Sequence, residues 1–278
     1  MMRIVQISDL HFGTVRHELT GPLTEVIRQA RPDLIVMAGD FVQRARTGQF
    51  RAARGFMDSL GAPWIGVPGN HDIPLYNIFA RLTAPYRKYH AWISHDREPW
   101  IETSDAVIIG IDTTDPMRWQ RGRIRGRQID RVCRAIMDED GRRTVIVAAH
   151  HPFHQRPDIE KKLMLAAPEA LDAWSSCGPH VILSGHLHSW LVEPFVTRRG
   201  DRQTLQVHSG TARSRRQRGE PNDFSILEVD GAEVSVTRMA AAPDIAVFRP
   251  TGRDIFERTD RGWSRRSRRI APRAVCSA

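Results

Sequence analysis

The sequence contains little cysteine and no hydrophobic run of membrane-spanning length. Three cysteines, Cys133, Cys177 and Cys276, are scattered over 278 residues, and no two of them form a CxxC pair. We therefore expect neither a disulfide framework nor a thiolate metal site, and we expect three free thiols. The longest apolar runs, such as residues 145–149, have the length of a strand, so no transmembrane helix is expected.

The first residues lack the apolar segment and the small-residue cleavage site of a secretory signal. The chain passes from Met1 directly into the alternating pattern of residues 4–7. A cytoplasmic location is the resulting expectation.

Positive charge is in excess and is concentrated near the end of the sequence. The formal net charge is +9, and within residues 251–278 eight arginines against three acidic residues leave +5. Apolar periodicity fades there into Arg, Ser, Gly and Pro. We therefore predict one domain over residues 1–250 and an Arg-rich mobile tail over 251–278. Contact of this tail with nucleic acid or an anionic membrane stays open, but a solubilising tail is preferred.

Apolar strand patterns alternate with amphipathic helical patterns, which indicates an α/β fold of packed layers. In the last third, four short strand patterns predict a second, largely antiparallel sheet. The expected early strands are 3–8, 33–38, 64–67, 106–111, 144–149 and 180–183, the expected helices are 18–30, 49–60, 127–138 and 168–174, and the expected late strands are 191–196, 204–208, 224–229 and 233–238.

Polar residues follow five of the early strands directly. In an α/β sheet, ligand sites form beyond the carboxyl ends of strands, so these residues are expected to gather at one edge. Carboxylate, amide and imidazole groups without thiolate suit Mn, Fe, Zn or Co better than Ca, and the set is large enough for two ions. Its members are Asp9, His11, Asp40, Asn70, His71, Asp72, His150, His151, His186 and His188.

The series DLH, GD, GNHD, a histidine after a strand, and GHLH, in this order over residues 9–188, resembles the calcineurin-like metallophosphoesterase superfamily. Within it, the sequence is most similar to bacterial class III cyclic nucleotide phosphodiesterase-like proteins. The resemblance implies an α/β fold of two packed mixed β-sheets flanked by helices, in four αββα layers. It also implies that one ion is held by Asp9, His11 and His188, that the other is held by Asn70, His150 and His186, and that Asp40 bridges them.

The stretch VPGNHDIPL, residues 67–75, could by itself be an ordinary turn. The resemblance implies instead that His71 is the catalytic residue, which donates a proton to the leaving oxygen. Asp72 either orients His71 or braces the loop, with bracing preferred. Gln43 stands where the family's protein phosphatases carry an Asp, and its amide could orient His71. Arg44 is a candidate for substrate binding, and a solvated arginine is the competing interpretation.

The expected activity is that of a dinuclear metal-dependent phosphodiesterase that hydrolyses a P–O bond of a cyclic nucleotide or similar small phosphodiester with a metal-bridging hydroxide. Alternatives on the same site are a nucleotide-sugar or lipid pyrophosphatase, a phosphomonoesterase and a nuclease, and a non-enzymatic scaffold is disfavoured because every expected ligand is present. Two arginine clusters, 121–127 and 213–218, could hold a further phosphate or could be solvated loops. Residues 73–82 are expected to pack on the core, and the oligomeric state is left open.

Overall fold

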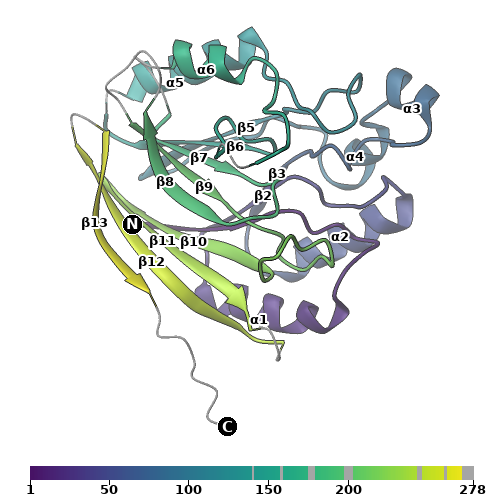
Figure 1. Ribbon diagram of the computed structural model, residues 1–278, viewed down its shortest axis with the longest axis horizontal. Helices are drawn as coiled ribbons and strands as arrows, with labels where there is room; N and C mark the ends of the chain where they lie inside the picture. The colour runs from purple at the N-terminus through teal and green to yellow at the C-terminus, as the bar shows by residue number, and fades with distance from the viewer. Residues whose placement is uncertain are drawn as a thin grey trace.

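The computed structural model consists of two β-sheets packed face to face, with helices on both outer sides (Figure 1). It describes residues 1–139, 141–156, 159–174, 179–196, 203–242, 246–259 and 262–270. The seven-stranded sheet has the order β13-β12-β11-β10-β1-β2-β3, and the six-stranded sheet has the order β4-β5-β6-β7-β9-β8. This arrangement confirms the expected four-layer α/β class.

The bounds of the elements follow the expected order along the chain. The first sheet contains β1 (Met2–Ile7), β2 (Leu34–Ala38), β3 (Trp64–Val67), β10 (Asp223–Asp230), β11 (Glu233–Ala241), β12 (Phe248–Thr259) and β13 (Gly262–Ile270). The second contains β4 (Trp100–Glu102), β5 (Ala106–Ile111), β6 (Thr144–Ala149), β7 (Val181–Ser184), β8 (Leu191–Val196) and β9 (Gln203–His208). The helical elements are η1 (His17–Leu19), α1 (Thr20–Ala30), α2 (Thr47–Ser59), α3 (Ile78–Thr83), α4 (Arg87–Trp92), α5 (Gly126–Glu139) and α6 (Ala167–Ala173).

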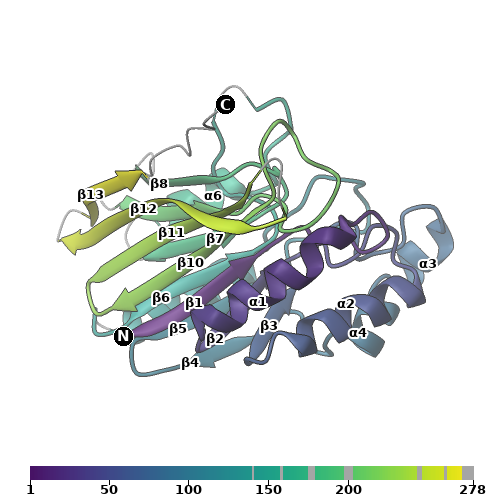
Figure 2. The same ribbon diagram turned by 90° about the horizontal axis from the view of Figure 1, so that it is seen from below.

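The layers follow from the alternation of side chains along each strand. On β1, Val5 and Ile7 belong to the apolar cluster shared with α1, α2 and α4, whereas Met2 and Ile4 belong to the cluster between the two sheets. A third cluster joins the outer face of the second sheet to α5 and α6. Helices α1 and α2 cover the first sheet, as Figure 2 shows from below.

The late strands do not form a separate antiparallel sheet, which corrects that expectation. Strand β9 pairs in parallel with β7 and carries β8 at the edge of the second sheet, whereas β10 pairs antiparallel with β1 in the first. Both sheets are therefore mixed. Strand patterning reveals which segments are extended but not which sheet each joins, because pairing depends on long-range contacts.

The predicted tail is also corrected, because residues 251–270 lie largely in strands β12 and β13. Phe256 and Trp263 are buried between the sheets, and Trp263 Nε1 donates to His180 O at 2.6 Å. The Arg266 guanidinium pairs with Glu233 at 3.5 Å and with Glu257 at 3.4 Å. The arginine-rich pattern therefore marks an outer strand face, and the proposed boundary at residue 250 falls inside β12. Residues 271–278 lie outside the described residues.

The segment 73–82 differs from expectation as well, since only part of it packs inward. Ile73 is buried, but Ile78 and Phe79 are 60% and 79% exposed. Arg81 takes the inward position instead and donates to the carbonyls of Pro74, Pro116 and Arg118. Because these carbonyls bind the guanidinium inside, the apolar residues on the other side of α3 face solvent.

Two further expectations concern cysteine and membrane insertion. Cys133, on α5, is disulfide-bonded, which corrects the expectation of three free thiols. Spacing along the sequence could not reveal this bond, because cysteine pairing depends on packing in three dimensions. Within the described part of the chain, no helix has the length and apolar character needed to span a bilayer.

Candidate metal centre

The seven expected ligand residues meet where strands of both sheets end. Strands β1, β2 and β3 run parallel in one sheet, and β5, β6 and β7 run parallel in the other. Their carboxyl ends therefore lie at the same edge of each sheet, and the loops that follow carry the polar side chains inward. Carboxylate oxygens and ring nitrogens within 4.8 Å of one another form the groups Asp9–His11–His188, Asp9–Asp40–His150, His11–Asp40–His71 and His150–His151–His186.

Backbone conformation at these loops is unusual. Five of the expected ligand residues have φ in the left-handed region, which non-glycine residues seldom adopt and which costs about 1–3 kcal/mol each. Such conformations cluster at functional sites, where the surrounding fold enforces them. The residues and their φ angles are Asp9 (53°), His11 (46°), Asp40 (56°), His186 (69°) and His188 (59°).

Glycines allow these loops to approach one another. A Cβ at Gly69 would lie 2.2 Å from Asp40 Oδ1, and one at Gly185 would lie 1.8 Å from Ser8 Oγ and 2.5 Å from Asp9 Oδ2. All three distances are shorter than any normal contact. The glycines of GNHD and GHLH are therefore required for close packing of the loops rather than for backbone freedom alone.

One half of the site is formed by Asp9, His11 and His188. The Nε2 atom of His188 lies 3.0 Å from Asp9 Oδ1 and 3.2 Å from His11 Nε2. His188 Nδ1 donates to Arg216 O at 2.5 Å, so Nε2 is the ring nitrogen that faces Asp9 and His11. Asp9 Oδ1 is buried. The two ring nitrogens and this carboxylate oxygen therefore converge on one point.

The other half repeats this arrangement around His150. Its Nδ1 donates to Ala38 O at 2.9 Å, which leaves Nε2 as the ring nitrogen that faces the site. Burial acts to lower the pKa of His150, but the Asp40 carboxylate raises this pKa to about 9, so Nε2 carries a proton that a bound cation would replace. His150 Nε2 lies 3.3 Å from Asn70 Oδ1, 3.2 Å from His186 Nδ1 and 3.4 Å from Asp40 Oδ2. Asp40 Oδ2 is also 3.7 Å from His11 Nε2, so this carboxylate contacts both halves.

The electrostatics of the two buried carboxyls agree with a cation-binding role. Burial acts to raise the pKa of Asp9, but the imidazoles of His188 and His11 lower it well below its usual value. Burial likewise opposes ionisation of Asp40, and His150 and His71 hold the Asp40 pKa well below its usual value. Ionised carboxylates and imidazole lone pairs directed at common points are the donor set that divalent transition ions prefer. The residues present therefore fit two such ions.

Neighbouring groups orient these ligands. Asn70 Nδ2 donates to Trp119 O at 3.4 Å, which directs Oδ1 of the same amide toward His150. Both ring nitrogens of His151 have partners, Thr113 Oγ1 at 2.9 Å and Gln120 O at 3.0 Å. Because the protein holds both nitrogens of this ring, His151 has a structural role beside the site.

His71 lies beside the first half of the site, with its ring 4.9 Å from that of His11. Its Nδ1 lies 2.9 Å from the backbone carbonyl of Gln43 and must therefore donate, which makes Nε2 an acceptor. Arg216 NH1 donates to this Nε2 at 2.8 Å. Burial, and to a lesser extent the Arg216 charge, lower the pKa of His71. Gln43 thus orients His71 through its main chain and not through its amide.

The two remaining candidates in this region have separate positions. The buried Asp72 carboxylate accepts from Val42 N at 3.0 Å and Gly69 N at 2.8 Å, so it braces the loop as preferred. The Arg44 guanidinium lies 5.0 Å from the ring centroid of Tyr76. Its backbone N–H donates to Gln49, and within the described residues it has no hydrogen bond to an expected ligand.

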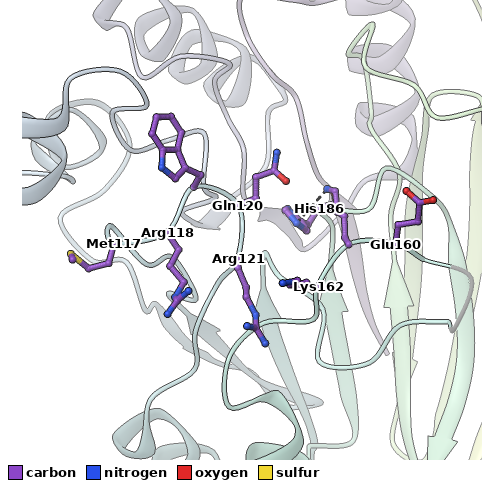
Figure 3. Close-up of a pocket in the computed structure, with 9 residues that line it drawn as sticks. Met117, Arg118, Gln120, Arg121, Glu160, Lys162 and His186 are labelled. Carbon is purple, nitrogen blue, oxygen red and sulfur yellow. Dashed lines mark hydrogen bonds between the residues drawn. The ribbon is translucent and has the colours of Figure 1, made fainter.

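Sequence reasoning did not single out two cationic residues that lie next to the expected ligands. Arg216 contacts His71 through its guanidinium and His188 through its carbonyl, although only its membership of an arginine cluster was visible. Lys161 Nζ donates to His186 O at 2.6 Å and lies 3.3 Å from His186 Nε2. Burial lowers the pKa of Lys161 to about 8. Lys161 and His186 line the same pocket. Figure 3 shows this pocket with His186 labelled.

Comparison with known proteins agrees with this geometry. The chain is 27% identical over 214 residues to a probable cyclic nucleotide phosphodiesterase of Synechococcus, covering 72% of this chain and 76% of the relative. It is 27% identical over 208 residues to the 3′,5′-cyclic adenosine monophosphate phosphodiesterase of Escherichia coli, covering 68% and 70%. Its fold resembles that of a dimetal phosphatase from Danio rerio with a TM-score of 0.63 at 12% identity, covering 84% and 95%.

The family is established by a match that spans most of the chain and includes every expected ligand. The sequence model that matches describes the calcineurin-like phosphoesterases, and it covers residues 2–190. The chain therefore belongs to the calcineurin-like phosphoesterase family and is a phosphoric ester hydrolase.

Proposed function

We propose that this chain is a phosphodiesterase with a dinuclear metal centre, in which Asp9, His11 and His188 hold one ion, Asn70, His150 and His186 hold the other, and Asp40 bridges them. One observation carries the proposal. Nε2 of His188 and Nε2 of His150 each lie 3.0–3.4 Å from two or more further candidate ligand atoms, while Nδ1 of each ring donates to a backbone carbonyl. Such sets are stabilised by cations.

The nitrogen and oxygen donors suit Mn, Fe or Zn. Two such ions would polarise the phosphoryl oxygens of an ester and lower the pKa of a water. The protein residues hold the ions and direct the substrate. The relatives named as cyclic nucleotide phosphodiesterases support a cyclic nucleotide or a similar small phosphodiester as substrate. A cytoplasmic location stays a prediction.

Arg216 and His71 are proposed to act together at the leaving oxygen. Because hydrogen bonds hold His71 with its proton on Nδ1, the positive charge at this position belongs to the Arg216 guanidinium. The Arg216 guanidinium would stabilise the negative charge that develops on the leaving oxygen, and His71 would orient this guanidinium. Proton donation by His71, expected from the sequence, would require Arg216 to withdraw from Nε2 first. Arg44 stays a prediction for substrate contact.

The decisive experiment measures metal content and turnover together. Purified protein loaded with Mn is assayed against bis-p-nitrophenyl phosphate, p-nitrophenyl phosphate, cyclic nucleotides and nucleotide sugars. Asp40→Ala is expected to lose both ions and all activity, because one carboxylate serves both halves, whereas the exposed control Asp58→Ala retains them. A protein with two bound ions and no activity on any diester would refute the proposal, and preference for a nucleotide sugar would favour a pyrophosphatase.

A further inference from the structure

A pocket of about 610 Å³ opens beside His186 and carries an excess of positive charge. Four cationic residues line it, and Glu160 is the single acidic residue among its described lining. In Figure 3, Arg118 and Arg121 extend in the same direction from the loop that carries them. The four cations are Arg118, Arg121, Lys161 and Lys162.

These cations are incompletely neutralised by the protein. Arg118 has a distant partner in Asp115 at 3.8 Å. Arg121 uses Nε to donate to Leu163 O at 2.6 Å, and its two terminal nitrogens make no hydrogen bond within the described residues. Lys162 likewise has no ion-pair or hydrogen-bond partner in that part of the chain. The pocket therefore has donors available for an anion.

The metal centre does not need this charge for a simple diester. The positive charge of two divalent ions, less the two negative charges of the Asp9 and Asp40 carboxylates, already exceeds the single negative charge of one phosphodiester. A substrate with only one phosphate would leave the pocket cations without a counterpart. A second anionic group in the substrate would satisfy them.

An aromatic surface lies in the same pocket. The side chain of Trp119 is 54% exposed, although it is large and apolar, and its backbone carbonyl accepts from the ligand Asn70. Exposed aromatic rings next to cations bind nucleobases by stacking, at about 1–3 kcal/mol per base. The loop that positions Asn70 thus also supplies a stacking surface.

We infer that this pocket binds the remainder of a dinucleotide substrate, with a base on Trp119 and a terminal phosphate on Arg121 and Lys162. The inference rests on the proposed function, because the scissile phosphodiester must lie at the metal centre. It deepens that function by selecting diesters with a second phosphate over cyclic mononucleotides.

The test compares substrates that differ by one terminal phosphate. Adenylyl-adenosine (ApA) is assayed beside its 5′-phosphorylated and 3′-phosphorylated forms, with bis-p-nitrophenyl phosphate as the reference diester. The better phosphorylated form is expected to show kcat/KM at least about tenfold above ApA, because charge-assisted hydrogen bonds contribute about 1.5–3 kcal/mol. Calorimetric titration of metal-free protein supplies a readout independent of turnover, in which adenosine 3′,5′-bisphosphate is expected to bind about tenfold more tightly than adenosine 5′-monophosphate.

Matched variants assign the effect to the pocket. Arg121→Ala/Lys162→Ala should reduce both ratios to near one and change bis-p-nitrophenyl phosphate hydrolysis less than threefold. The control Arg249→Ala/Arg266→Ala removes the same charge from the β12–β13 region and should retain both ratios. If the double variant fails to fold, Lys162→Gln should lower the ratios about threefold.

The inference is wrong if kcat/KM is equal for ApA and its phosphorylated forms. It is also wrong if the preference for a phosphorylated form survives in Arg121→Ala/Lys162→Ala, or if the control Arg249→Ala/Arg266→Ala loses that preference equally. In each case hydrolysis of ApA would leave the proposed phosphodiesterase intact. Failure to hydrolyse every diester with two ions bound would instead refute the proposed function.

Discussion

Gly185→Ala should damage the metal centre without altering any ligand. The added Cβ would lie 1.8 Å from Ser8 Oγ, so Ser8 or the loop must move by about 1.5 Å to reach an ordinary contact distance. Ser8 Oγ donates to Asp9 Oδ2 at 2.6 Å, and His186 N donates to the same oxygen at 2.9 Å. The substitution therefore displaces the partners that orient Asp9.

The expected loss combines overpacking with weakened hydrogen bonds to a buried carboxylate. Each of these effects typically costs about 1–3 kcal/mol, so together they should lower the free energy of unfolding by about 2–6 kcal/mol. For a chain of this length that lowers Tm by about 4–24 °C. Loss of ligand orientation should weaken metal binding by about 10–100-fold.

The assay measures thermal unfolding by circular dichroism and bound metal by mass spectrometry on the same preparations. Gly55→Ala on α2 is the control, because a Cβ there meets nothing within 4 Å, and it should stabilise the helix by about 1 kcal/mol. Wild-type Tm and metal content in Gly185→Ala would show that the loops tolerate a side chain, and the close-approach explanation would be wrong.

The other predictions concern charge, protonation and the C-terminal strands. Arg216→Ala should slow hydrolysis of diesters with alkyl leaving groups by about 10–100-fold, since charged hydrogen bonds contribute about 1.5–3 kcal/mol. Hydrolysis of bis-p-nitrophenyl phosphate should slow less than threefold. Equal losses on the two kinds of substrate, or the same loss in Arg218→Ala, would contradict this role. Burial lowers the pKa of His208 to about 4, so as the pH falls the unfolded chain binds a proton on this histidine before the folded chain does. The contribution of His208 to the free energy of unfolding therefore falls by about 3 kcal/mol between about pH 6.5 and pH 4. Urea unfolding at several pH values should show a decline that is smaller by about 3 kcal/mol in His208→Asn than in the wild type, because the pKa of the buried His11 is also lowered to about 4. Parallel profiles would rule out the contribution of His208. Trp263→Ala should cost about 3–5 kcal/mol and Arg266→Ala under about 1 kcal/mol in urea unfolding, whereas equal midpoints would mean that β13 contributes nothing to the core.

The sequence was sufficient to predict the regular part of the fold and the gathering of the proposed ligand residues at one place. Strands such as Trp64–Val67 and Ala106–Ile111 have the predicted bounds, because continuous apolar runs between turn residues have few alternative structures. The ligand residues could be grouped because they directly follow such strands. What could not be predicted depends on contacts between distant segments.

Three examples show this limit. Arg216 reaches His71 from a loop 145 positions away, and nothing local distinguishes it from the arginines beside it. Trp263 looked like an isolated aromatic in a basic tail, yet it fills space between two sheets. Periodicity predicted that the apolar side of the segment around Arg81 faces the core. Arg81 takes the buried position instead, because three backbone carbonyls accept from its guanidinium. In each case a tertiary partner decides the outcome.

Each half of the proposed metal centre would draw its ligands from both sheets. Asp9 and His11 follow a strand of the first sheet and His188 follows one of the second, just as Asn70 belongs to the first and His150 and His186 to the second. Bound ions would therefore act as cross-links between the sheets, in addition to the apolar layer that joins them. Ions at 100 times their dissociation constant would add about 2.7 kcal/mol per independent site to the stability of the fold. Chelation should therefore lower the unfolding temperature of the whole sandwich and not only abolish activity.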